Sequence, residues 1–193
     1  MKHLIIIEGP DNTGKDTLQK NLQNKLGDCV TFHFTSPPSN IDKKEKLNYQ
    51  VKTWKKIWSD TKKSINENGL NFGIWNRSHL GEYVYGQMYR NTPANIIRNE
   101  IEKFENDFLK PYENEIKQHL VILIPDVNTV IENDDGLSHS IKLIDKLNEI
   151  QLFKEFINLT CIKDSFIYEV CSPNGEFKND IVIRDQILNR LDI

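Results

Sequence analysis

Short runs of apolar residues alternate along this chain with longer stretches in which apolar positions recur every third or fourth residue. The first run, Leu4 to Ile7, is continuously apolar and mostly β-branched, which is typical of a strand covered on both faces of a parallel sheet. Four later runs have a similar character. We therefore predict strands at residues 4–7, 29–34, 70–75, 119–124 and 166–171.

The stretches between these runs follow the helical period. In the first of them, Leu18, Leu22 and Leu26 share one face, and Gly27 is a natural stop. Pro93 can start a helix, and Pro111 should kink or divide it. We predict helices at residues 17–26, 42–67, 79–89, 93–117, 141–159 and 181–191, with a short one reaching about residue 132.

Strands that alternate with helices predict an α/β fold with a mostly parallel five-stranded sheet in a three-layer α/β/α arrangement. Connections in such a sheet are right-handed, and its functional site lies at the carboxyl ends of the strands. The length of 193 residues suits one domain over the whole chain, 1–193.

Charge and composition exclude several function classes. The formal net charge is -3, from 25 Lys and Arg against 28 Asp and Glu, so any anion site must be local. The start, MKHLIIIEG, is unlike a signal peptide, and no run approaches the ~20 apolar residues of a membrane span. Three cysteines without metal-like spacing read as buried thiols. We expect a cytoplasmic protein that binds neither nucleic acid nor a membrane.

A glycine-rich loop, EGPDNTGKDT at residues 8–17, joins the first strand to the first helix. Gly9, Gly14 and Lys15 have the G-x-x-x-x-G-K spacing of a phosphate-binding loop, and strand–loop–helix is the context which that motif requires. Backbone N–H groups and the helix N-terminus would hold phosphate, while Lys15 reaches the β- and γ-phosphates. We predict that ATP is bound by Asp11, Asn12, Thr13, Gly14, Lys15, Asp16 and Thr17.

Asp16 stands where this loop usually has the Ser or Thr that binds magnesium. One interpretation is a disabled loop. The other is that the Asp16 carboxylate replaces the hydroxyl as a ligand of Mg²⁺, which suits this hard cation. Two like unit charges roughly 4 Å apart cost about 4 kcal/mol at an effective dielectric near 20. Asp16 would therefore make nucleotide binding unusually dependent on magnesium.

A second motif, NRSHLGEYVYG at residues 76–86, follows the third predicted strand. It resembles the Asp-Arg-aromatic motif of P-loop thymidylate kinases, with Arg77 at the arginine position and Tyr85 at a tyrosine position eight residues later. The order of GPDNTGKDT, this motif, VILIPDV and a polar segment also matches. The chain thus resembles the thymidylate-kinase-like deoxynucleoside monophosphate kinases. That resemblance implies a nucleoside-monophosphate-kinase-like P-loop fold, with Arg77 holding the acceptor phosphate and Tyr85 near the sugar.

The chain also departs from the resemblance. The family's acid before the arginine is Asn76 here, so the magnesium carboxylate could have moved from this position to Asp16. Glu8 matches a family acid that could orient magnesium waters or the acceptor. The family's transition-state arginine is missing from the loop and from the polar segment. Lys142, Lys146 or Arg90 could supply the cation.

The resemblance also assigns regions. Acceptor-binding helices are expected at about 42–67 and 79–115, a lid at about 133–140, and the adenine neighbourhood at 173–177. Residues predicted to bind the acceptor are Glu8, Phe34, Trp54, Arg77, Tyr85 and Arg90. We read Asp126 as a helix N-cap. His79 reads either as a phosphate contact or as an exposed residue at a helix start.

The predicted function is magnesium-dependent transfer of the ATP γ-phosphoryl to a deoxynucleoside monophosphate, dTMP or a related pyrimidine nucleotide. Lys15, Asp16 and Arg77 are the predicted catalytic residues, and Asp16 and Glu8 the metal ligands. A deoxynucleoside kinase is the nearest alternative, because its motif reads acid-Arg-Ser, but Asn76 cannot act as the base that it needs. A nucleotide-binding regulator without catalysis is the other. A homodimer is possible within the family.

Overall fold

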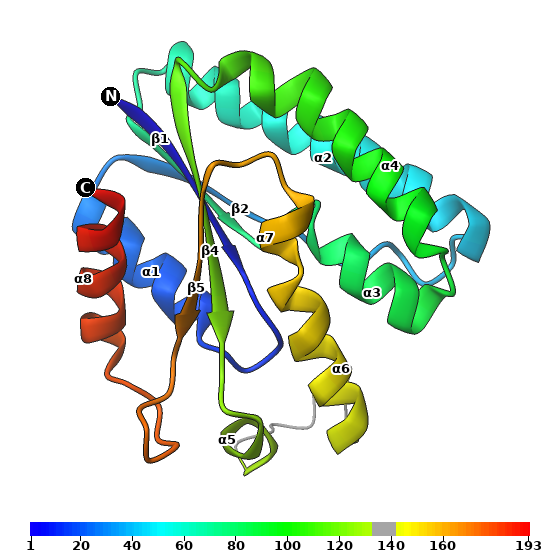
Figure 1. The fold of residues 1–193 in the computed structure, drawn as a ribbon. Helices are drawn as coiled ribbons and strands as arrows, with labels where there is room; N and C mark the ends of the chain where they lie inside the picture. Colours follow the sequence, from blue (N-terminus) through cyan, green and yellow to red (C-terminus); the bar gives the residue numbers. More distant parts are fainter. Residues whose placement is uncertain (133–141) are drawn as a thin grey trace.

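A parallel sheet organises the computed structural model, which describes residues 1–132 and 142–193. Its five strands follow the order β2-β3-β1-β4-β5, and every neighbouring pair is parallel (Figure 1). The strands are β1 (Lys2–Glu8), β2 (Cys29–His33), β3 (Phe72–Asn76), β4 (Ile116–Ile124) and β5 (Asp164–Glu169). This is the α/β fold with a five-stranded parallel sheet that the sequence predicts.

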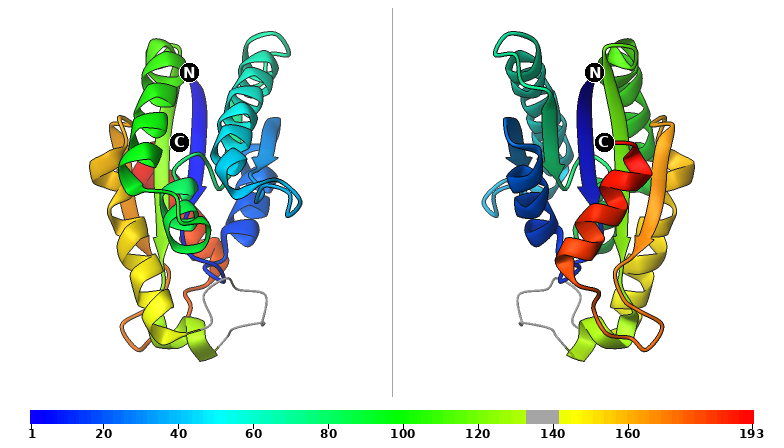
Figure 2. Two further views of the ribbon diagram at one scale, coloured as in Figure 1. Left: turned by 90° about the vertical axis from the view of Figure 1, so that its right-hand side faces the viewer. Right: turned by 90° about the vertical axis from the view of Figure 1, so that its left-hand side faces the viewer.

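Helices cover both faces of the sheet (Figure 2). The helix α1 lies with α8 on one face, and α2, α3, α4 and α6 lie on the other (Figure 1). Their bounds are α1 (Lys15–Leu26), α2 (Lys43–Asn66), α3 (Gly81–Arg90), α4 (Ala94–Phe104), α5 (Val127–Glu132), α6 (Leu143–Lys154), α7 (Phe156–Leu159) and α8 (Asp180–Leu191).

The continuous apolar run of β1 feeds two cores. Leu4 and Ile6 pack into the cluster formed with α2, α3 and α4, whereas Ile5 and Ile7 pack against α1 and α8. All four side chains are fully buried. Successive side chains of a strand point to opposite faces, so an unbroken apolar run is what a sheet covered on both sides needs.

Several predicted elements differ from the structure in their bounds. The helix expected over 93–117 leaves α geometry at Glu105, continues as a π turn (Glu105–Leu109) and a 3₁₀ turn (Lys110–Tyr112), and is replaced by β4 from Ile116. Ile116 is fully buried and pairs with β1, so sheet pairing overrides the helical period there. The helix expected over 141–159 is divided between α6 and α7. The fifth strand ends at Glu169 rather than at Cys171.

Other assignments are confirmed or corrected by local contacts. Asp126 caps α5, because its Oδ1 accepts from the backbone nitrogens of Asn128 at 2.9 Å and Thr129 at 3.3 Å.

The interpretation of the cysteines as buried thiols is wrong for Cys161, which is exposed, and Cys29 and Cys171 are only half-buried. Partial burial of its thiol and the nearby Glu105 carboxylate nevertheless raise the pKa of Cys161 to about 12.

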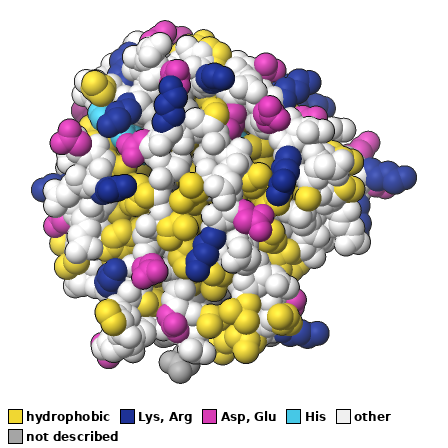
Figure 3. Space-filling model, in the orientation of Figure 1, with side chains coloured by type: hydrophobic (Ala, Val, Ile, Leu, Met, Phe, Trp, Pro, Cys, Tyr) yellow, Lys and Arg dark blue, Asp and Glu magenta, His cyan; other side chains and the backbone are white. Residues whose placement is uncertain are grey.

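The surface mixes apolar side chains with both signs of charge (Figure 3). On α6 three apolar residues are exposed, Leu143, Ile144 and Leu147. None of the helices in the described ranges has the length and apolar character to cross a membrane.

Candidate functional site

The phosphate-binding loop leaves β1 at its carboxyl end and enters α1 at Lys15. Gly9 has a φ of 146°, and a Cβ at this position would overlap the carbonyl oxygen of Leu123 in β4. Gly14 has a φ of 80° and forms the N-cap of α1. Both positions therefore require glycine, one for a close approach of two backbones and the other for a left-handed turn.

Lys15 is folded back into this loop. Its side chain is buried and its Nζ donates to the carbonyl oxygen of Pro10, with Oγ1 of Thr13 at 3.4 Å. Burial and the nearby guanidinium of Arg77 lower the pKa of Lys15 to about 8, against the opposing effect of surrounding acids. A bound phosphate would add negative charge here and favour the ammonium form.

Asp16 and Asn76, two positions at which the sequence departs from the thymidylate-kinase pattern that it resembles, are in direct contact. The amide nitrogen of Asn76 donates to Oδ1 of Asp16 at 2.5 Å and to Oε1 of Gln19 at 2.9 Å. Asn76 is fully buried, whereas the Asp16 side chain is 73% exposed. An exposed carboxylate beside the loop fits Mg²⁺, which typically binds through one or two carboxylates together with substrate phosphates.

Glu8 lies beneath this site with a fully buried carboxylate. Its Oε1 accepts from Oγ of Ser78 at 2.6 Å and from the backbone nitrogen of Gly81 at 3.2 Å, and Oε2 has no partner among the described residues. Burial raises the pKa of Glu8, although its hydrogen bond from Ser78 opposes that effect. Within residues 1–132 and 142–193, no cluster of three or more His, Cys, Asp and Glu could hold a metal ion by itself.

Arg77 is held directly across from the phosphate loop. It has a φ of 65°, and its backbone nitrogen donates to the Ile7 carbonyl at 2.9 Å. Its guanidinium pairs with the Asp11 carboxylate of the loop and donates to the Tyr85 hydroxyl at 2.9 Å. Although burial opposes the charge of Arg77, Tyr85 and Asp11 outweigh it and hold its pKa above the usual value.

Tyr85 extends the network to α6. Its hydroxyl donates to Oε1 of Glu149 at 3.1 Å, and both side chains are buried. The network of Asp11, Arg77, Tyr85 and Glu149 thus links the phosphate loop, the end of β3, α3 and α6.

A cavity of about 220 Å³ opens beside Arg77. It lies between the segment that follows β2, the helix α2 and the helix α3. It is lined by His33, Phe34, Thr35, Ser36, Gln50, Trp54, Arg77, Ser78, Gly81, Glu82, Tyr85 and Arg90. The structure therefore brings Phe34, Trp54, Arg77, Tyr85 and Arg90 together, while Glu8 supports the wall through Ser78 and Gly81.

Two further cavities lie beyond the other side of the loop. One of about 210 Å³ separates the loop from α8, and its lining includes Asn12, Thr13, Gly14, Thr17 and Phe177. The adjoining one, of about 550 Å³, is lined by Asp126, Asn128, Thr129 and residues 173–177. The predicted adenine neighbourhood thus borders the predicted phosphate-binding residues.

Both interpretations of His79 are wrong. The side chain is fully buried, and its Nε2 lies 2.8 Å from Oε1 of Glu105. Glu105 also accepts from Thr160 and from the backbone nitrogen of Cys161. Through Glu105, His79 therefore links the turn that precedes α3 to the π turn and to the segment before β5, and its full burial leaves it no access to a bound phosphate.

The three side chains that could replace the missing arginine differ in how deeply they are buried. Lys142 is exposed, whereas Lys146 on α6 is 4% exposed and lies three residues before Glu149. Arg90 pairs with Glu82; the Glu82 side chain is buried and that of Arg90 is 11% exposed. The predicted lid, 133–140, lies outside the described residues.

Sequence reasoning missed Gln50, Glu82 and Glu149. Gln50 and Glu82 line the cavity beside Arg77, and Glu149 accepts from Tyr85. The available signal was weak: each is a polar residue on a helix face that is otherwise buried.

No family model and no curated protein sequence matches the chain. Solved structures match its fold at low identity. YorR of Bacillus subtilis, in complex with phosphorylated GDP, has a TM-score of 0.64 at 16% identity, covering 98% of this chain and 95% of that one. Thymidylate kinase of Ehrlichia chaffeensis has a TM-score of 0.65 at 11% identity, with 98% of both chains covered.

Deoxyadenosine kinase of M. mycoides, with bound dCTP, has a TM-score of 0.54 at 18% identity, again with 98% of both chains covered. All three likenesses extend over nearly the full length of this chain. The chain therefore has the fold of the P-loop nucleotide kinases.

Proposed function

We propose that the protein is a kinase that transfers the γ-phosphoryl group of ATP to a deoxynucleoside monophosphate. The observation that carries this proposal is the contact between Asp11 of the phosphate loop and Arg77 at the mouth of the cavity. It brings the donor loop and the acceptor-side cation to one point. A phosphoryl group moving between two anionic substrates needs such convergence, since its catalysis is mostly positioning and charge neutralisation.

The donor would bind along the loop and the N-terminus of α1. Backbone N–H groups there, together with Lys15, would hold the β- and γ-phosphates. The base would lie toward the cavity that Phe177 lines. Asp16 would hold magnesium with the nucleotide, and the ion would neutralise charge on the phosphate oxygens.

The acceptor would occupy the cavity beside Arg77. Its phosphate would take the place that the Asp11 carboxylate holds in the structure, because an Arg guanidinium binds either anion in a similar geometry. Tyr85 would keep the guanidinium oriented during this exchange. Glu8 would act as a positioning residue through Ser78 and Gly81.

Lys146 is the proposed replacement for the missing transition-state arginine. It is buried on α6, one helical turn from the Glu149 that contacts Tyr85. Loss of an arginine finger costs about 10³-fold or more in rate, so a lysine there would support slower turnover. A lid at 133–140 and a homodimer remain expectations from the resemblance.

A deoxynucleoside acceptor is the second candidate, and one observation favours it. Both arginines of the cavity are already paired with acids, Arg77 with Asp11 and Arg90 with Glu82, so the cavity holds little uncompensated positive charge. Against it, Asn76 cannot take a proton from a sugar hydroxyl.

A coupled assay of ADP release separates the candidates. The purified chain is supplied with ATP, magnesium and either a deoxynucleoside monophosphate or the matching nucleoside, with an acceptor-free reaction as the control. The proposal expects acceptor-dependent release with monophosphates. Release with nucleosides alone would favour the second candidate, and binding of ATP without any release would favour a regulator without catalysis.

A further inference from the structure

The cavity beside Arg77 has an end that the phosphate chemistry does not use. Arg77 and Ser78 lie at the end of β3, while Gln50 projects from α2, and Glu82 and Arg90 from α3. With the acceptor phosphate at Arg77, these last three groups are left for the rest of the ligand. Treating this cavity as the acceptor site is the only respect in which the inference rests on the proposed function.

Gln50 presents an acceptor. Its amide nitrogen donates to the backbone carbonyl of Thr35 at 3.0 Å. A carbonyl can only accept, so this contact fixes which end of the amide is the nitrogen. The side chain is 5% exposed and lines the cavity. The oxygen Oε1 of Gln50 is therefore the end that remains to bind a ligand.

Glu82 is a second acceptor with unused capacity. Its Oε2 pairs with Arg90, and its Oε1 is buried with no hydrogen-bond partner in the part of the chain that the structure describes. The side chain is 3% exposed. Oε1 lies against Gly86, and the terminal torsion of a glutamate is broad and roughly two-fold, so rotation of the carboxylate can exchange the oxygen that faces Gly86 with the other one. A buried acceptor of this kind is costly unless some donor satisfies it.

A buried ion pair is a weak source of stability, because the desolvation of both charges offsets their attraction. The Glu82–Arg90 pair lines a cavity instead of closing off a core, so its position fits ligand recognition better than packing. Burial raises the pKa of Glu82, whereas the hydrogen-bonded Arg90 opposes that effect and favours the charged, acceptor-only carboxylate.

We infer that this wall of the cavity, formed by Gln50, Glu82 and Arg90, selects an acceptor whose base carries an exocyclic amine. Gln50 and Glu82 would accept from the N–H groups of that base. Adenine and cytosine each present an NH₂ group, and guanine presents an NH₂ group beside a ring N–H. Thymine offers one ring N–H and otherwise carbonyl oxygens, which would face the Glu82 carboxylate. The thymine nucleotide expected from the sequence resemblance is thus the disfavoured acceptor.

Calorimetric titration of the full chain with dAMP, dCMP, dGMP and dTMP, without ATP, tests the inference. At least one amine-bearing nucleotide should bind about tenfold or more tightly than dTMP, because a site built for hydrogen bonds rejects analogues that lack them. Binding of dTMP that equals or exceeds all the others would overturn the inference, as would failure of all four to bind at millimolar concentration.

Two variants and a control assign the effect to the wall. Glu82→Gln places an amide donor beside the base, and Gln50→Met removes the other acceptor; each should shrink the preference over dTMP. Gln87→Met is the matched control, since Gln87 donates to the Tyr83 carbonyl from the same helix and does not line the cavity. Circular dichroism verifies folding of each variant. An unchanged preference in both wall variants would contradict the assignment.

These titrations separate the inference from the proposed function. The predicted base ranking without ADP release from ATP would leave the inference standing and reject phosphoryl transfer. Acceptor-dependent ADP release together with tightest binding of dTMP would support phosphoryl transfer and reject the inference about the base.

Discussion

The charged side chains around the phosphate loop each contact a partner within the protein. Lys15 donates to the Pro10 carbonyl, Arg77 pairs with Asp11, and Asp16 accepts from Asn76. Such contacts keep these groups in place before the substrates arrive, so less reorganisation is needed during the reaction. Their protonation and exchange should therefore be visible in binding measurements.

The affinity for ATP should fall as pH rises through about 8. The pKa of Lys15 in the free protein is lowered to about 8, while phosphate favours the ammonium. Above this pH, binding requires uptake of one proton, so the Kd should rise up to about tenfold per pH unit. Titrations between pH 7 and 9.5 check this. Lys15→Arg, which stays protonated, should show a much flatter profile, and equal slopes in both proteins would contradict the account.

Asp16 and Asn76 should behave as an exchanged pair. Asp16→Ser removes the exposed carboxylate and should weaken magnesium-dependent ATP binding and turnover by about 10- to 100-fold, the range for losing a partner at a metal site. Adding Asn76→Asp returns a carboxylate to the position that contacts Asp16 at 2.5 Å in the structure. The double variant should recover a substantial part of both properties. If it recovers no more than Asp16→Ser alone, the two positions do not exchange roles.

At the scale of elements, the site depends on how closely the loop after β1 approaches β4. Gly9 makes that approach possible, because a side chain there would overlap the Leu123 carbonyl. The phosphate loop is thereby fixed against the centre of the sheet, between strands that are buried on both faces.

Gly9→Ala should therefore displace the loop and abolish measurable ATP binding. Gly27→Ala is the matched control: its φ of 77° strains any side chain, but nothing lies within 4 Å of the added Cβ. The control should lose roughly 1–3 kcal/mol of stability and keep its ATP affinity. Calorimetry and urea unfolding measure the two effects. ATP binding by Gly9→Ala at the wild-type affinity would show that the loop does not need this approach.

The sequence predicts the elements with strong local signals and misses those fixed by tertiary contacts. The run Leu4–Ile7 and the spacing of Gly9, Gly14 and Lys15 lead to the sheet and the loop. Nothing local shows that Ile116 pairs with β1 and ends the helical segment early, or that His79 is buried against Glu105. Likewise Gln50 and Glu82 become recognisable only when α2 and α3 meet across the cavity.

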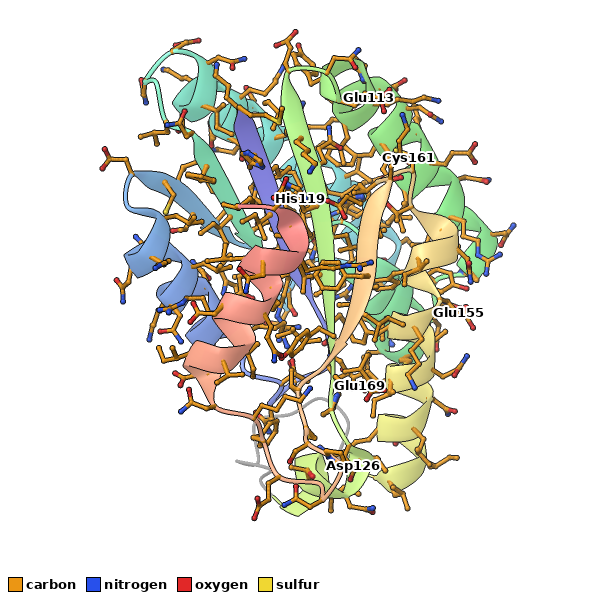
Figure 4. All side chains as sticks on the ribbon, turned by 60° about the vertical axis from the view of Figure 1, so that its left-hand side comes forward. Glu113, His119, Asp126, Glu155, Cys161 and Glu169 are labelled. Atoms are coloured by element: carbon orange, nitrogen blue, oxygen red, sulfur yellow. The ribbon has the colours of Figure 1, made fainter. Side chains whose placement is uncertain are left out.

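At the scale of the whole molecule, a row of contacting polar side chains lies at the opposite end of the sheet from the phosphate loop. Nδ1 of His3 is 3.0 Å from Nε2 of His119, whose Nδ1 is 2.6 Å from Oδ2 of Asp164. His119 lies near the start of β4, whereas Asp126 follows its end (Figure 4). The contacts among His3, His119 and Asp164 tie β1, β4 and β5 together and take no part in the proposed chemistry.

Stability should fall as pH drops below about 6.5. Burial and the neighbouring His119 and Lys117 lower the pKa of His3 from 6.5 to about 4, and burial also lowers the pKa of His119 despite Asp164. The unfolded chain therefore binds more protons, so this contribution is complete above pH 6.5 and is lost toward pH 4.

Urea unfolding at pH 7.5 and pH 5 measures this loss. In His3→Phe, which can keep the stacking on Phe72, the fall between the two values should be smaller. An equal fall in both proteins would place the pH dependence elsewhere in the molecule.

Phosphoryl transfer by the chain can be followed by ³¹P NMR in a mixture with ATP, magnesium and a deoxynucleoside monophosphate. We expect the ATP γ signal to disappear while signals of a deoxynucleoside diphosphate grow with those of ADP, and we expect Lys15→Met to abolish both changes. Release of inorganic phosphate alone, or an unchanged spectrum with the wild-type chain, would contradict it.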